Sequence, residues 1–128
     1  MKVLLDTCTF LWMTSGDGRL SEEATRLIID PNNEVFLSTV STWEISVKHA
    51  LGRLPLPADP IHYLPKLRRD HAIDSLPLDE ESTLYLGKLP PLHRDPFDRM
   101  LICQAIVGGL ALVTPDEAIT QYPVRALW

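Results

Sequence analysis

The sequence predicts an α/β fold in which a mainly parallel sheet of about five strands is covered by helices on both faces. Two observations predict it. Short apolar runs alternate with helical segments along the chain, and the runs are apolar enough to be buried on both sides. No repeat, low-complexity tract or linker interrupts the pattern, so we expect a single domain over residues 1–128.

The expected strands are short apolar runs bounded by turn residues or acids: residues 3–5, 35–38, 73–76, 110–113 and, as a closing edge strand, 124–127. The expected helices follow capping residues and end at glycine, proline or a turn: residues 7–14, a helix starting at 21–23, one from 41–42 to about 51, then 64–70, 80–88, 97–107 and one turn at 118–121. The proline-rich stretch 54–65 is expected to be a loop that leads into helix 64–70.

Composition limits the functions to consider. The hydrophobic content of 45% and the charged content of 23% are typical of a soluble globular protein. The longest apolar stretch is too broken to cross a membrane, and no signal peptide is apparent, so we expect a cytoplasmic protein. Cys8 and Cys103 lack zinc-type spacing and are expected to be reduced. A net charge of −5 means that nucleic-acid binding must rest on local features.

Two acids follow expected strands. Asp6 comes directly after the first strand, and Asp116 follows the strand 110–113 by three residues. The carboxyl ends of parallel strands form the edge at which open α/β sheets bind ligands. Each acid also has a structural interpretation. Asp6 can cap the next helix, and Asp116 lies within a capping pattern that starts at Thr114 and closes at Glu117.

Glu44 is predicted to face the core. An expected apolar stripe on its helix consists of Val40, Trp43, Val47 and Leu51. Glu44 lies within this stripe, where an ionised carboxylate is costly unless a cation or hydrogen bonds satisfy it. The alternative is an ordinary surface ion pair with Lys48, four residues further on.

Two acids lie at the start of the strongest helix. Asp95 precedes Pro96, which fits a helix cap followed by proline at the first helical position. Asp98 occupies the third position, where it can complete a capping box. Asp98 also shares a stripe with Leu101 and Ile102, which directs it inward. We therefore interpret Asp98 as a ligand and Asp95 as mainly a cap that also tunes the site.

The four acids Asp6, Glu44, Asp98 and Asp116 would repel one another in a shared cleft, and a hard cation relieves that repulsion. All-oxygen ligands select Mg²⁺ or Mn²⁺ over zinc. The four histidines are dispersed without ligand spacing, although His93 is near enough to contact substrate. The set predicts metal-assisted attack of water on a phosphodiester.

The chain also resembles the PIN-domain family, and within it the VapC-type toxins of bacterial toxin–antitoxin pairs. The matching segments, in family order, are Leu4–Thr7 with Leu11-Trp12, Ser38–Ile45, Lys48–Leu54, His93–Arg99 and Leu112–Asp116. The resemblance implies a three-layer α/β/α fold and Mg²⁺- or Mn²⁺-dependent RNA cleavage by the same four acids. It also implies a homodimer, and a heterotetramer or larger assembly with a small antitoxin.

The RNA is expected to track along basic residues, because phosphate contacts supply most of the affinity. The candidates are Lys48, Arg53, Arg68, Arg69 and Arg99. Two other functions stay open: a catalytically inactive PIN-like binding module and a housekeeping RNA-processing nuclease. A receiver domain is excluded because the paired acids after its first strand are missing, and a haloacid-dehalogenase phosphatase because Asp6-Thr7-Cys8 replaces its Asp-x-Asp.

Overall fold

The structure is a computed structural model that describes residues 1–128. Five strands form one sheet in the order β3-β2-β1-β4-β5, and every pair is parallel, which confirms the expected class and shows a sheet that is parallel throughout. The strands are β1 (Lys2–Leu5), β2 (Glu34–Ser38), β3 (Asp74–Leu76), β4 (Ala111–Val113) and β5 (Ala126–Leu127). The α-helices are α1 (Thr7–Ser15), α2 (Glu22–Ile29), α3 (Thr39–Ala50), α4 (Pro60–Asp70), α5 (Glu80–Tyr85) and α6 (Pro96–Gly108), and two 3₁₀ turns are η1 (Leu86–Lys88) and η2 (Ile119–Gln121).

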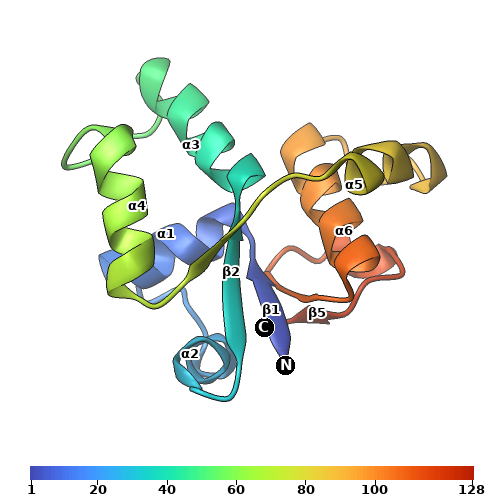
Figure 1. Cartoon of the computed structure of the whole chain (residues 1–128), viewed down its shortest axis with the longest axis horizontal. Coiled ribbons are helices and arrows are strands. Elements are labelled where there is room, and N and C mark those ends of the chain that lie inside the picture. The colour runs from blue at the N-terminus through green and yellow to red at the C-terminus, as the bar shows by residue number, and fades with distance from the viewer.

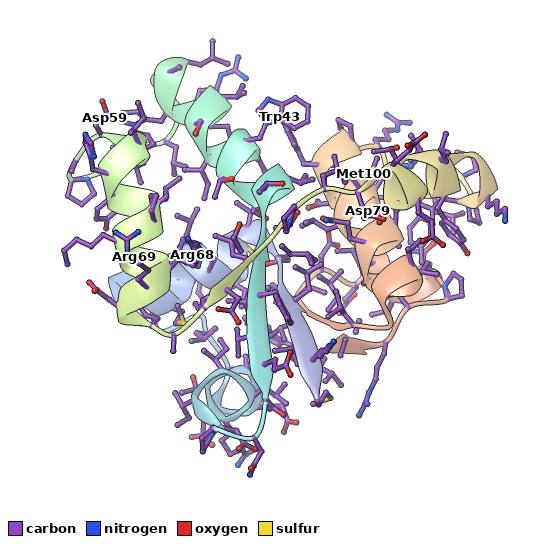
Figure 2. The ribbon with its side chains drawn as sticks, in the orientation of Figure 1. Trp43, Asp59, Arg68, Arg69, Asp79 and Met100 are labelled. Carbon is purple, nitrogen blue, oxygen red and sulfur yellow. The ribbon has the colours of Figure 1, made fainter.

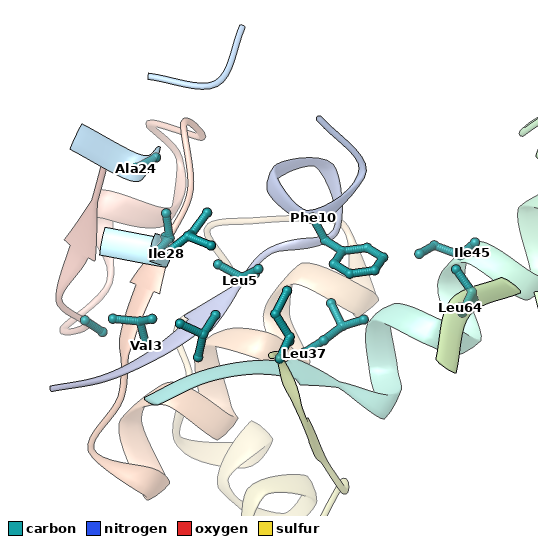
Figure 3. Close-up of a cluster of buried hydrophobic side chains, with 12 residues drawn as sticks. Val3, Leu5, Phe10, Ala24, Ile28, Leu37, Ile45 and Leu64 are labelled. Carbon is teal, nitrogen blue, oxygen red and sulfur yellow. The ribbon is translucent and has the colours of Figure 1, made fainter. Parts of the chain in front are cut away.

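Helices cover both faces of the sheet. Helices α1 to α4 lie on one side, and α5 and α6 lie on the other (Figure 1). Side chains alternate along β1, so that Val3 and Leu5 belong to the core beneath α1 to α4, which Figure 3 shows, whereas Leu4 joins the core under α6. All three side chains are fully buried, which is why this strand is a continuous apolar run.

The strand register brings three polar residues to one edge. Leu5 pairs with Leu37 of β2 and with Val113 of β4. The residues that follow, Asp6, Ser38 and Thr114, therefore leave the sheet at the same level. Strand β1 is also where the strand order reverses, since the chain builds β2 and β3 on one side of it and later adds β4 and β5 on the other.

Helix α4 begins earlier than the sequence predicted. It starts at Pro60, and residues 60–63 are helical rather than part of a loop. Asp59 caps it by accepting a hydrogen bond from the Ile61 N–H at 3.0 Å. Pro60 occupies the first turn, where a backbone N–H would have no partner within the helix, so its missing N–H costs nothing. Pro65 is tolerated inside the helix. The expectation of a loop was wrong at Pro60 because a proline in the first turn of a helix has no intrahelical hydrogen bond to lose.

The remaining elements differ only at their ends. The expected helix 80–88 is an α-helix to Tyr85 followed by a 3₁₀ turn, and β5 is a two-residue edge strand. Cys8 and Cys103 are free thiols, as expected. No helix combines the length and the apolar character that a membrane crossing requires.

Candidate functional site

One cavity of about 270 Å³ at the carboxyl edge of the sheet brings together all four predicted acids. Asp95 also lines it, so that five carboxylates from separate parts of the chain face a single space. The complete lining is Asp6, Thr7, Cys8, Leu11, Glu44, Lys48, Leu54, Asp95, Asp98 and Asp116.

Asp6 is both a helix cap and a cavity residue. Its Oδ1 accepts hydrogen bonds from the Thr9 N–H at 2.8 Å and from the Cys8 thiol at 3.2 Å, and its Oδ2 accepts from the Thr114 hydroxyl. Burial, with a contribution from the Asp6 charge, raises the pKa of the Cys8 thiol, so Cys8 acts as a donor here. The capping interpretation is confirmed, and it coexists with exposure of the carboxylate to the cavity.

Glu44 is buried, although the predicted stripe was wrong. Trp43, Val47 and Leu51 are 59%, 37% and 62% exposed. The Trp43 ring, labelled in Figure 2, packs edge-on against the ring of Phe97 on α6, with 4.9 Å between the ring centroids. Only Val40 of the expected stripe is in the core, and the buried face of α3 consists of Val40, Ser41, Glu44 and Ile45. This face lies against α1 and α6, and periodicity alone does not distinguish it from an apolar surface stripe.

Two side chains hold the Glu44 carboxylate. Its Oε1 accepts from the Thr7 hydroxyl at 2.7 Å, and its Oε2 pairs with Lys48, the partner that the alternative interpretation named. The hydrogen bond to Glu44 raises the pKa of Lys48. Lys48 is the one basic residue in the cavity lining, so five carboxylates face one ammonium group.

The start of α6 sets two acids in different environments. Asp95 caps the helix, as predicted, and its Oδ1 accepts from the backbone N–H groups of Phe97 at 2.8 Å and Asp98 at 3.3 Å. The Asp98 side chain is 21% exposed. Burial first, and then the charges of Asp95 and Glu44, raise the pKa of Asp98 from its usual 3.8 to about 7. The neighbouring carboxylates therefore oppose its ionisation.

The capping pattern expected after β4 is absent. The Thr114 hydroxyl donates to Asp6 and accepts from the Asp116 N–H at 3.1 Å, which makes a tight turn. Glu117 is exposed, and the short helical turn begins only at Ile119. The prediction was wrong because the Thr114 hydroxyl accepts within a local turn at Asp116, and the helical turn that it was expected to cap starts five residues further on. Asp116 is held in turn by the Ala118 N–H at 2.9 Å.

His93 lies among these acids more closely than the sequence indicated. Its Nε2 is 2.9 Å from Oδ2 of Asp116 and 3.3 Å from Oδ2 of Asp98. Together these three residues offer atoms that lie within 4.8 Å of one another. Spacing along the chain missed the cluster because Asp116 is 23 residues from His93, and only the turn after β4 brings them together.

The basic residues expected to contact RNA are spread over the molecule. Lys48 lines the cavity, whereas none of the four predicted arginines does. Arg68 donates to the Ile73 carbonyl at 3.1 Å and fixes the end of α4, and Arg69 is exposed on the same helix (Figure 2). Arg53 is exposed, and Arg99 is half-buried on α6. Contacts between these arginines and RNA stay a prediction.

Two solved structures share this fold. A chain of the VapBC2 complex of Rickettsia felis, bound to a DNA fragment from its promoter, has a TM-score of 0.74 at 15% identity and covers 99% of this chain and 98% of its own. A chain of VapBC-1 from nontypeable Haemophilus influenzae has a TM-score of 0.61 at 18% identity and covers 99% and 97%. At these identities the likeness is one of fold.

The sequence itself matches known proteins. Ribonuclease VapC16 of Mycobacterium tuberculosis is 35% identical over 71 residues, a match that spans 52% of this chain and only 50% of that relative. The sequence model of the PIN-domain family matches residues 3–124, which is nearly the whole chain. With the parallel sheet and the acid-lined edge already described, this match shows that the chain belongs to the PIN-domain family.

Proposed function

We propose that the protein is a divalent-metal-dependent endoribonuclease and the toxin of a toxin–antitoxin pair. The observation that carries the proposal is the single cavity in which five carboxylates face one ammonium group. The similarity to ribonuclease VapC16 supports RNA as the substrate class. We assign Asp6, Glu44, Asp98 and Asp116 as the ligands, and Asp95 as the cap that shapes the site.

The chemistry of the cavity fits a hard cation. Its carboxylate oxygens are the donors that Mg²⁺ and Mn²⁺ prefer. Burial first, and then the charges of Asp95 and Glu44, raise the pKa of Asp98 to about 7, and a cation in the cavity would favour its ionised form. When bound, a divalent ion would activate water and neutralise the charge that develops on a phosphodiester during cleavage.

The protein's own residues prepare the site before any ion arrives. Thr9 and Thr114 fix the Asp6 carboxylate, and Thr7 fixes Glu44. These bonds hold the acids in place and so reduce the reorganisation that binding requires. The Lys48 side chain is 45% exposed at the cavity, where it can attract an RNA phosphate.

Metal removal tests the activity. We expect the purified protein to cleave labelled RNA in Mg²⁺ or Mn²⁺, to lose cleavage in excess chelator, and to regain it when the ion is restored. Cleavage that persists in chelator would overturn the proposal. If metal binds but no RNA is cut, the inactive binding module is supported, and cleavage without an antitoxin gene beside the coding sequence favours a housekeeping nuclease.

We also propose that the toxin is a homodimer that pairs with a small antitoxin. The chain of a toxin–antitoxin complex from Klebsiella pneumoniae shares the fold, with a TM-score of 0.64. Trp43, Val47 and Leu51 leave an apolar stripe exposed along α3, and a second copy of the chain would cover it.

Leu51→Glu tests this dimer. Placing a charge in the stripe is expected to convert the dimer to a monomer, because an unpaired charge in an apolar interface is costly. Ile29→Glu is the matched control, since Ile29 is 70% exposed on α2, away from the stripe, and receives the same charge. Sedimentation equilibrium measures the mass of both variants. A Leu51→Glu protein that stays dimeric would place the interface elsewhere.

A further inference from the structure

His93 lies close enough to two of the proposed ligands that it could itself ligate a metal. Its Nε2 lies 2.9 Å from Asp116 and 3.3 Å from Asp98, and its side chain is 15% exposed. Distance alone would fit a mixed nitrogen and oxygen site. The two possible roles differ in the position of the ring hydrogen, because a nitrogen that carries a hydrogen has no lone pair for a metal.

A backbone group decides where that hydrogen lies. The Asp95 N–H donates to Nδ1 of His93 at 3.1 Å. Nδ1 therefore carries no hydrogen, and the ring hydrogen is on Nε2, which is hydrogen-bonded to Oδ2 of Asp116 and lies 3.3 Å from Oδ2 of Asp98. Histidines that ligate a metal through one nitrogen usually donate their other N–H to an acceptor. The arrangement at His93 is the reverse, because its second nitrogen faces a donor.

The backbone that carries the ring is also held. The backbone N–H groups of His93 and Leu92 both donate to the Tyr122 hydroxyl, at 2.7 and 3.0 Å. Tyr122 is only 3% exposed and belongs to the core under α6. Two independent anchors, one on the backbone and one on Nδ1, thus fix the imidazole at the start of α6.

We propose that His93 is a positioning residue that bridges Asp116 and Asp98 through its Nε2–H and does not ligate the metal. The bridge turns one oxygen of each carboxylate toward the ring and leaves the other lone pairs for the ion. It also keeps the ligand set all-oxygen. The inference rests on the proposed metal site for its purpose, but the hydrogen position is a property of the metal-free protein and is testable separately.

The test is NMR on protein labelled with ¹⁵N-histidine, with His93 assigned by the signal that disappears in His93→Gln. In the metal-free protein we expect a protonated Nε2 and an unprotonated Nδ1. A hydrogen on Nδ1 would overturn the proposal even if the protein never binds metal. Pulsed EPR of the Mn²⁺-loaded protein should show no directly coordinated ¹⁵N, and a strong ¹⁵N coupling that His93→Gln removes would also overturn it.

Three variants separate the bridge from mere packing. The N–H₂ of Gln reaches the position of Nε2 and can donate to the carboxylates. The oxygen of Asn can take the place of Nδ1 and accept from the Asp95 N–H, but the N–H₂ of Asn is too short to reach the carboxylates. Leu offers neither group. We expect Mn²⁺ affinity to fall by less than about threefold in His93→Gln and by about tenfold or more in His93→Asn and His93→Leu. His62→Leu, on the exposed face of α4, is the control and should bind as the parent does. Equal losses in all three His93 variants, with unchanged melting temperatures, would contradict the bridge.

Discussion

Asp6→Asn is expected to abolish RNA cleavage and to leave thermal melting almost unchanged. Asparagine retains the size of the side chain and an oxygen that accepts from the Thr9 N–H, so the cap of α1 survives. The N–H₂ that replaces Oδ2 can donate to the Thr114 hydroxyl, which reverses that hydrogen bond and keeps it. The charge that faces the cavity disappears. We expect the initial rate on labelled RNA in Mn²⁺ to fall by at least about a hundredfold, and circular dichroism to give the same melting temperature.

Asp74→Asn is the matched control for this variant. Asp74 is exposed on the edge strand β3 and does not line the cavity, yet the substitution makes the same chemical change. It should retain the parental rate. Full activity of the Asp6→Asn protein would show that Asp6 is not a ligand and would contradict the proposed ligand set.

Asp98→Asn is expected to stabilise the metal-free protein at pH 8 while weakening the proposed metal site. The pKa of Asp98 is raised to about 7 by burial and by the charges of Asp95 and Glu44. Between about pH 4 and 7 the folded protein therefore keeps a proton that the unfolded chain releases. Its free energy of unfolding falls as the pH rises through this window. Asparagine removes this buried charge, and we expect the free energy of unfolding at pH 8 to rise by about 2 kcal/mol.

Urea unfolding at pH 5 and pH 8 in the presence of chelator measures this effect. The advantage of Asp98→Asn over the parent should be small at pH 5 and largest at pH 8. Glu22→Gln is the control, because Glu22 is also an acid in the first turn of a helix but is exposed on α2. It should give no pH-dependent gain. Parallel pH profiles for Asp98→Asn and the parent would show that the carboxylates do not repel one another as described.

Local sequence was sufficient for much of the fold and for part of the site. The β1 run and the Asp95-Pro96 start of α6 depend on neighbouring residues, and both were predicted correctly. Strand ends also placed Asp6 and Asp116 at one edge, because parallel topology determines where the carboxyl ends lie.

Features that depend on distant contacts were not predictable in this way. Glu44 is buried as expected, but on a face next to Ser41 and Ile45 rather than within the Trp43 stripe. An apolar stripe looks the same in sequence whether the core or a partner covers it. The commitment of the Thr114 hydroxyl to Asp6 spans 108 residues, and no local pattern reports it.

Calorimetric titration of Mn²⁺ into the metal-free protein tests the central claim most directly, because it needs no knowledge of the RNA target. A cavity in which five carboxylates face one ammonium group should bind the ion with saturable heat, and Asp98→Asn should weaken that binding by at least about tenfold. Binding should also release a proton near pH 7, since Asp98 must ionise to ligate. The absence of binding at millimolar Mn²⁺ would contradict the metal site.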